Sequence, residues 1–459
     1  MSVHDGVNTA VTSSSNRKSI GSRVVEWVAC LTLVVASLGL VLWHVPLHTT
    51  VSPIDEYVYI DYLAKVPTQL VVHRGEETGD YARAYLACNG VRTIGYYPEA
   101  MCSTPNPNQE PRLPNGGLTS ADLYTPLYFG ATWLMAQPLQ EFGVEDLTEA
   151  GRYSGFVWLA AASILLYLTL RRWKVPVLVA WGAGILLVGS LPAYWSNTYI
   201  STDATALFAG ALMLFGASLF NRPSRWSIAW LTAFAVVVSL LKLQNLMAVG
   251  AVALTLIALA SYESFNAEGT LRQRLGSFIR DRRTLAAGIS LASAVLAQGI
   301  WVVIRSAIAV GALPDQGVSA PFGKTAFLNE ALKFFPGVSS GALNPAVFGP
   351  GAVVAATVTM WIVLAGVLGL LASSKRGSTD EALVVSALVV ALAAGPLLAM
   401  VNIQVSGFYF DLPARYGMSL LPIFIACAAL LFAQKTWIAW LLPLFGLISY
   451  LAVLSIPEV

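Results

Sequence analysis

Charged side chains are scarce in this sequence, and so are histidine and cysteine. Only 11% of its 459 residues are Asp, Glu, Lys or Arg, whereas soluble domains carry about 25%. The 4 cysteines have no zinc-motif spacing. The chain also lacks a cationic, aromatic-interleaved domain of the kind that binds nucleic acid and the Gly-x-x-x-x-Gly-Lys-Ser/Thr loop that binds ATP. These absences argue against soluble, nucleic-acid-binding and ATP-driven proteins.

Long apolar runs are what the sequence has instead. Hydrophobic residues make up 56% of the chain, in runs of about 18–25 residues, the length that crosses a bilayer. The sequence therefore predicts an all-α polytopic membrane protein. The expected spans are 24–46, 152–170, 175–194, 202–220, 226–242, 245–262, 285–309, 350–372, 381–400, 416–433 and 436–455.

These are eleven spans, and twelve is the alternative if residues 122–140 also cross the membrane. In that case the basic Arg171-Arg172-Trp173-Lys174 would lie outside, against the positive-inside rule. With 122–140 as an interfacial helix on the outer face, most of the 27 Lys and Arg residues fall in inner loops. Eleven spans with a cytoplasmic N-terminus is therefore the better topology.

This topology divides the chain into a tail and one membrane domain. Residues 1–22, rich in Ser and Asn, are expected to be a disordered cytoplasmic tail. Residues 23–459 form a single transmembrane domain, in which 48–151 and 310–348 are extracytoplasmic loops and 263–284 is a basic cytoplasmic loop. The first loop is expected to contain interfacial helices. The composition suits a bacterial plasma membrane.

Acidic residues stand at the outer ends of two predicted spans. Asp55 and Glu56 follow the first span, where a carboxylate can act as a general base, or where the pair can hold a divalent metal. Two solvated acids are the alternative. Asp203 opens the fourth span, either as an acid favoured by the helix dipole or as a third carboxylate of the same site.

Basic and aromatic residues at the same face are candidates for substrate binding. Lys242 ends the fifth span, Arg305 lies late in the seventh and Arg415 precedes the tenth. Each can bind a phosphate, or it can extend to the interface or pair with a nearby acid. His73 is a weaker candidate. The aromatic candidates, which fit either a membrane-interface belt or stacking on a sugar, are Tyr124, Tyr128 and Tyr416.

The cysteines fall into two pairs by environment. Cys30 and Cys427 lie in apolar runs and read as small core residues. Cys88 and Cys102 share the first outer loop, where an oxidising compartment would allow a disulfide between them. The sequence does not favour a disulfide over two free thiols at Cys88 and Cys102.

The order of these features resembles the GT-C superfamily of membrane glycosyltransferases, which includes protein mannosyltransferases and lipid A aminoarabinose transferases. The resemblance covers roughly residues 24–250 and 405–425, and the 263–404 region matches in topology only. The elements that carry it are Asp55-Glu56, the long outer loop, Thr125-Pro126-Leu127-Tyr128, Arg152-Tyr153, Asp203, Lys242 and Arg415-Tyr416. The chain departs from the pattern at Thr125, where relatives often have Lys or His.

The resemblance implies transfer of a sugar from a polyprenyl-phosphate carrier to a glycan, lipid or protein acceptor on the outer face. It assigns Asp55, with Glu56 beside it, as the catalytic base or metal-associated acid and Asp203 as the second acid. Lys242 and Arg415 would hold the carrier phosphate. An apolar groove between spans would hold the prenyl chain, and a divalent metal is an open alternative. Many such relatives work as monomers.

Two other functions remain open. A flippase or transporter without chemistry would show an internal repeat with broken helices at matching positions, and we find no convincing repeat. A lipid-linked glycan polymerase or ligase on another helical fold would use the same carrier. The sequence names neither the sugar nor the acceptor.

Overall fold

The computed structural model describes residues 20–91, 114–221, 224–312, 319–342 and 344–457. Within these ranges the regular elements are helices, accompanied by three isolated β-bridges. The α-helices are α1 (Ile20–His44), α2 (Glu56–Gln69), α3 (Asp80–Asn89), α4 (Pro126–Glu141), α5 (Leu147–Tyr153), α6 (Gly155–Arg172), α7 (Val177–Val188), α8 (Leu191–Asn197), α9 (Ala204–Ser218), α10 (Ser227–Leu241), α11 (Leu246–Asn266), α12 (Leu271–Arg280), α13 (Arg282–Ala307), α14 (Lys324–Lys333), α15 (Pro350–Ser373), α16 (Thr379–Ser406), α17 (Leu421–Phe432) and α18 (Leu441–Leu454).

Short 3-10 helices join or extend several of these elements. They are η1 (Val45–Leu47), η3 (Pro114–Gly117), η4 (Ala121–Leu123), η5 (Leu219–Asn221), η6 (Leu243–Asn245), η7 (Gly337–Ser340), η8 (Pro345–Phe348) and η9 (Ala414–Leu420). Two of them bear on function, because η6 follows a break between α10 and α11, and η9 leads into α17.

The described residues contain 7 helical segments long and apolar enough to cross a membrane, or 8 if α7 and α8, bent by 55°, form one span. Three shorter apolar helices, α9, α10 and α18, accompany them. Each predicted span coincides with one of these segments. The prediction of an all-α, multi-pass membrane protein is confirmed, whereas the count of eleven stays a prediction.

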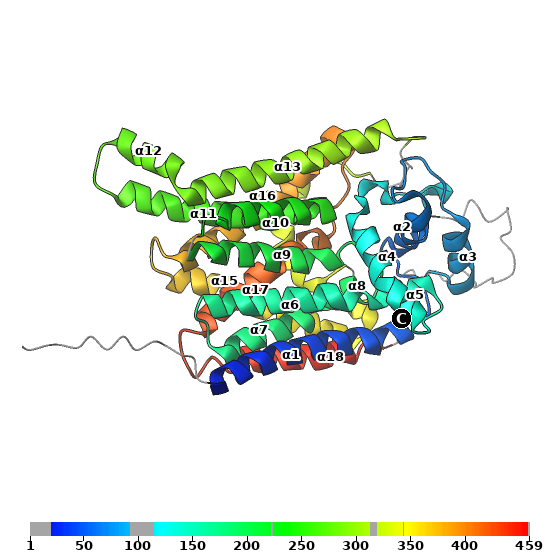
Figure 1. Ribbon diagram of the computed structural model, residues 1–459, viewed down its shortest axis with the longest axis horizontal. Helices are drawn as coiled ribbons and strands as arrows, with labels where there is room; N and C mark the ends of the chain where they lie inside the picture. The colour runs from blue at the N-terminus through cyan, green and yellow to red at the C-terminus, as the bar shows by residue number, and fades with distance from the viewer. Residues whose placement is uncertain (1–19, 92–113, 222–223, 313–318, 343, 458–459) are drawn as a thin grey trace, which may run out of the picture.

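Figure 1 shows the long helices side by side, with α1 and α18 along one edge of the bundle and α13 along the opposite edge. At one end of the bundle lie α2, α3, α4 and α5, and at the other end lies α12. We call residues 51–91 and 114–153 the cap. All four helices of the cap begin within the predicted outer loop, 48–151. They lie at the same end of the bundle.

The cap has an apolar core of its own. Tyr62 of α2 stacks on Phe129 of α4, with ring centroids 4.0 Å apart. Ile200 and Leu241, which belong to the bundle, are buried in the same cluster. The cap is therefore seated on the adjacent ends of α9 and α10. Helix α4 is not among the candidate spans in the described chain, in keeping with the expected interfacial helix.

A close backbone approach joins α9 to η9. A Cβ atom placed on Gly210 of α9 would lie 2.2 Å from the carbonyl oxygen of Ser419, far inside van der Waals contact. Only glycine allows this spacing. The approach matters because two candidate site residues lie here: Asp203 directly precedes α9, and Arg415 lies in η9.

The two predicted loops beyond the cap contain more helix than expected. Within 263–284, α11 continues to Asn266 and α12 follows. Within 310–348, the described residues include α14 and η7. The predicted tail, 1–22, falls almost entirely outside the described residues, and so does Cys102. The Cys88–Cys102 disulfide therefore stays a prediction.

Candidate functional site

Four charged side chains meet where the cap contacts the bundle. Arg415 Nη2 donates to Asp55 Oδ2 at 2.6 Å, and Arg415 Nη1 donates to Asp203 Oδ2 at 3.3 Å. Lys242 Nζ donates to the other oxygen of Asp203. We call Asp55, Arg415, Asp203 and Lys242 the charge cluster. Its members come from four separate parts of the chain, and their roles stay predictions.

The charge cluster is buried at one end and open at the other. The Lys242 side chain is 1% exposed, whereas that of Asp55 is 45% exposed. Buried charges are costly unless each has a hydrogen-bonded partner, and here two cations face two carboxylates. A molecule arriving from solvent or from the membrane interface therefore meets Asp55 first, with Arg415 directly behind it.

An unusual backbone conformation orients Asp55. This residue precedes α2 with φ 59° and ψ 1°, in the left-handed region. Few residues other than glycine adopt this region, and Asp is among the more tolerant. The conformation lets the side chains of the neighbours Asp55 and Glu56 take different partners.

Glu56 does not join the charge cluster, which corrects its expected place at the site. Its carboxylate is fully buried and pairs with Arg152 through Nε at 2.9 Å and Nη2 at 2.8 Å. The backbone N–H groups of Ser52 and Ile200 also donate to it. Both oxygens are thus occupied by donors, so the expected shared metal site of Asp55 and Glu56 does not fit the geometry. The described residues hold no group of three or more His, Cys, Asp or Glu side chains placed to bind a metal ion.

Arg152 is a residue whose partner the sequence analysis missed. Besides Glu56, its guanidinium donates to the carbonyl oxygens of His48 at 2.8 Å and Thr50 at 2.9 Å. It therefore ties α5 to the segment that leads from α1 into Asp55. An arginine directly before a long apolar run was the available signal, because such a residue needs a partner when buried.

Two predicted site residues hold the loop that carries Asp203. Glu56 accepts a hydrogen bond from the Ile200 backbone N–H at 3.0 Å, and the Tyr128 hydroxyl accepts one from the Ser201 N–H at 3.0 Å. Ser201 Oγ in turn accepts from the Asp203 N–H. Glu56 and Tyr128 therefore hold the backbone of the loop that positions Asp203.

Lys242 lies at a break between two helices. Its backbone is extended, with φ −162° and ψ 134°, between α10 and η6. Helix ends leave carbonyl groups without intrahelical partners, and here side chains supply them. Asn245 Nδ2 donates to the Val238 carbonyl at 3.0 Å, and Thr125 Oγ1 donates to the Leu240 carbonyl at 2.6 Å. The break thus has a fixed geometry.

Tyrosine rings surround the cations of the charge cluster. Lys242 Nζ lies 5.9 Å from the centroid of Tyr124 and 5.7 Å from that of Tyr416, and Arg415 also lies over Tyr416. Such contacts favour a cation where water is excluded. The hydroxyls of Tyr59 and Tyr124 are 3.0 Å apart. Burial raises the pKa of both phenols, so they stay protonated and can donate.

Two predicted substrate-binding residues have other partners. Arg305 pairs with Asp122 through Nε at 2.5 Å. His73 donates its backbone N–H to Glu76 at 2.9 Å. Within the described chain, neither side chain forms a hydrogen bond or an ion pair with the charge cluster. This corrects the expectation that Arg305 and His73 belong to the same site.

Little free space remains beside Asp203. A cavity of about 10 Å³ is bordered by Ser52, Tyr199, Ser201 and Asp203, which is room for one water molecule. A sugar cannot fit there without rearrangement. The accessible side of the site is therefore the side on which Asp55 is exposed.

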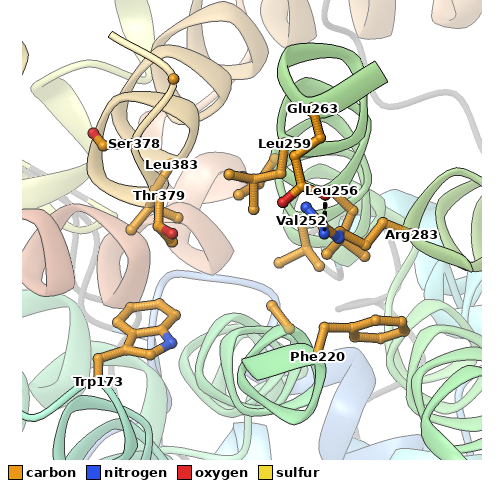
Figure 2. A pocket seen from close by; sticks show the side chains of 13 residues that line it. Trp173, Phe220, Val252, Leu256, Leu259, Glu263, Arg283, Ser378, Thr379 and Leu383 are labelled. Carbon is orange, nitrogen blue, oxygen red and sulfur yellow. Dashed lines mark hydrogen bonds and ion pairs between the residues drawn. The ribbon is translucent and has the colours of Figure 1, made fainter. Parts of the chain in front are cut away.

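A larger pocket, of about 480 Å³, lies toward the α12 end. Figure 2 shows Val252, Leu256 and Leu383 on its walls and the paired side chains of Glu263 and Arg283 at one side. It is formed by residues near the far ends of α9, α11, α13 and α16, whereas the charge cluster lies at the cap end. The pocket and the cluster are therefore separate.

Comparison with known proteins identified no relative of this chain. No protein-family model matches the chain, and no curated protein matches it.

Proposed function

We propose that this chain is a GT-C membrane glycosyltransferase, which moves a sugar from a polyprenyl-phosphate carrier to a glycan, lipid or protein acceptor. One observation carries the proposal. Arg415 bridges a partly exposed carboxylate, Asp55, to the buried pair of Asp203 and Lys242. This arrangement sets a candidate base beside two cations at one end of an apolar bundle.

The chemistry assigns a role to each member. Asp55 takes the proton of the acceptor hydroxyl, whose oxygen forms a bond to the anomeric carbon of the donor. The bond from that carbon to the phosphate oxygen breaks, and polyprenyl phosphate leaves. Arg415 and Lys242 stabilise the charge that develops on the phosphate. The planar fork of Arg415 suits this role, because it can contact two oxygens at once.

Asp203 has a positioning role in this scheme. It accepts hydrogen bonds from both cations, so it fixes their separation before substrate arrives. Preorganised charges avoid the cost of reorienting solvent or side chains during the reaction. The loop contacts from Glu56 and Tyr128 extend this preorganisation to the cap.

The proposal includes the topology. Eleven spans, the three shorter apolar helices among them, place the cap on the outer face and α12 on the cytoplasmic face of a bacterial plasma membrane. The arginines support this direction, because Arg272, Arg274 and Arg280 of α12 are at the end opposite the cap. The prenyl chain then lies between spans near the cap.

A flippase is the second candidate, and one observation favours it. Helices α7 and α8 form a bent pair, and broken helices near a binding site are typical of transporters. Such a protein would move a lipid-linked sugar across the membrane without breaking a bond in it.

The deciding experiment is sugar transfer by the purified full chain. Radiolabelled polyprenyl-phosphate sugars are offered with a membrane extract as acceptor, to wild type, Asp55→Asn and Asp411→Asn. Asp411 is a matched control, because it is an exposed carboxylate that pairs with Lys333. We expect Asp55→Asn to lose transfer at preserved folding and Asp411→Asn to keep it. Equal transfer by both variants excludes Asp55 as the base. Movement of lipid-linked sugar across liposomes with no donor consumed supports the flippase.

A further inference from the structure

A second pocket, of about 590 Å³, lies between the cap and the end of α1 and is lined in part by Arg152. Three elements each supply one wall. From α3 come Tyr81, Ala84, Tyr85, Cys88 and Asn89; from the start and face of α5 come Asp146, Glu149 and Arg152; and from the end of α1 onward come Val45, Pro46 and His48. We call it the α3–α5 pocket.

The α3 wall follows the helical repeat. Positions 81, 84, 85, 88 and 89 are spaced i, i+3, i+4, i+7 and i+8, which is one face of a helix. On this face the rings of Tyr81 and Tyr85 are stacked, 6.3 Å apart at 25°. Tyr81 is 38% exposed, and its hydroxyl is 3.1 Å from that of Thr148 on α5. The face therefore presents two flat apolar rings, and the hydroxyl of Tyr81 is anchored to α5.

The α5 wall carries carboxylates without basic partners. Asp146 uses one oxygen to cap α5, accepting from the Glu149 backbone N–H at 2.8 Å. Within the described residues neither Asp146 nor Glu149 forms an ion pair with Lys, Arg or His, and Arg152 on the same helix is engaged by Glu56. These acids can accept hydrogen bonds from hydroxyl or ammonium groups, and they repel anions.

The third wall contains a buried polar atom with no partner. His48 is 6% exposed, and its Nδ1 has no hydrogen-bond partner among the residues that the structure describes. The other ring nitrogen, Nε2, lies 2.9 Å from Thr198 Oγ1, and the ring stacks on Tyr199 at 3.8 Å. A buried polar atom without a partner costs free energy. A ligand hydroxyl reaching His48 would supply that partner.

We propose that the α3–α5 pocket binds a non-reacting sugar unit of the acceptor, one that is neutral or carries an amine, and that it excludes anionic sugars. This inference rests on the proposed glycosyl transfer. Arg152 lines the pocket and pairs with Glu56, the chain neighbour of Asp55. One buried ion pair therefore separates the pocket from the chain segment that carries Asp55. Binding energy from such a remote unit can position the reacting hydroxyl.

The test measures glycan binding without any donor. The purified full chain, in detergent, is applied to an array of defined oligosaccharides that are neutral, amine-bearing, or anionic through carboxylate or phosphate groups. Wild type is expected to bind neutral or amine-bearing glycans at least about tenfold more strongly than anionic ones, because the carboxylates of Asp146 and Glu149 repel anions; tenfold corresponds to about 1.4 kcal/mol. The Tyr81→Ala and Glu149→Gln variants are expected to lose about tenfold of that binding.

Asp80→Asn is the matched control. Asp80 is an exposed acid in the first turn of α3, and it does not line the pocket. Its replacement is expected to leave glycan binding unchanged, and Tyr81→Phe, which keeps the ring, is expected to keep most of it. Thermal stability and monodispersity are measured for every variant, and only variants that match wild type in both are compared. Loss of binding is then distinguished from loss of folding.

Three results would overturn the proposal: no glycan bound by folded wild type, anionic glycans preferred, or full binding by both Tyr81→Ala and Glu149→Gln. The glycosyl transfer itself is judged separately by Asp55→Asn. If transfer depends on Asp55 while the array stays negative, the pocket assignment fails and the enzyme assignment stands. If glycans bind while no donor is consumed, the pocket is a glycan-binding site and the enzyme assignment fails.

Discussion

The guanidinium of Arg152 and the carboxylate of Glu56 form a buried, two-point ion pair, although 96 residues separate them. Each partner also fixes backbone groups, of His48 and Thr50 on one side and of Ser52 and Ile200 on the other. The segment that leads into Asp55 is held by this pair. The Glu56–Arg152 pair therefore affects both the stability of the protein and the position of Asp55 in the charge cluster.

Removing one partner of this pair should destabilise the protein strongly. Arg152→Met leaves the Glu56 carboxylate buried without its cation, and such changes cost about 3–5 kcal/mol. We expect a large drop in thermal stability in detergent. The double variant Glu56→Leu/Arg152→Met removes both charges and should recover a substantial part. Equal stability of the single and the double variant would contradict this account.

Arg415→Lys should impair transfer while preserving the fold. Lysine keeps the charge but lacks the planar fork whose two nitrogen atoms contact Asp55 and Asp203 at once. We expect kcat/KM to fall by about 10²-fold, the scale of losing one preorganised donor. Arg305→Lys is the matched control, because Arg305 also pairs with a carboxylate, Asp122. It should keep most activity, and comparable losses in both variants would argue against a specific role for Arg415.

Gly210→Ala should separate α9 from η9. The added Cβ would lie 2.2 Å from the Ser419 carbonyl oxygen, and overpacking of this kind costs about 1–3 kcal/mol. Thermal stability and transfer should fall together, since the helices concerned place Asp203 and Arg415. Gly130→Ala in α4, which meets nothing within 4 Å, is the control. It should be neutral or slightly stabilising.

Acid should weaken the cap through His48. Burial lowers the pKa of His48 well below its usual value, with the Arg152 charge acting in the same direction. Below about pH 6.5 the unfolded chain binds a proton that the folded chain refuses, so stability falls as the pH falls, by up to about 1.4 kcal/mol per pH unit. Thermal unfolding between pH 7 and 5 measures this slope.

His48→Gln should reduce that slope, because glutamine does not titrate, whereas the neighbouring buried histidine, His44, remains. His73→Gln is the control, because the His73 side chain is 38% exposed, and it should retain the slope. A slope unchanged in His48→Gln would show that another group is responsible.

The sequence predicted the membrane bundle well because long apolar runs are a local signal. It also pointed to Asp55, Asp203, Lys242 and Arg415, which the structure brings together. Two of these, Asp203 and Arg415, lie 212 residues apart. Their meeting depends on helix packing, for which the order of motifs in a resembling family was the only available guide.

Glu56 could not be placed by the same reasoning. Adjacent residues diverge or converge according to backbone angles, and the left-handed conformation at Asp55 leaves no clear trace in the sequence. Arg305 was misplaced for a related reason. Its partner Asp122 lies 183 residues away, so an ion pair between them is invisible until the cap is folded onto α13.

The Thr125 hydroxyl takes part in two structures at once. It accepts from the Leu127 N–H at the start of α4 and donates to the Leu240 carbonyl at the end of α10, two residues before Lys242. A shift of α4 therefore changes the strain on the segment that carries Lys242. A displacement of the cap can therefore reach the chain segment before Lys242 through one hydroxyl group.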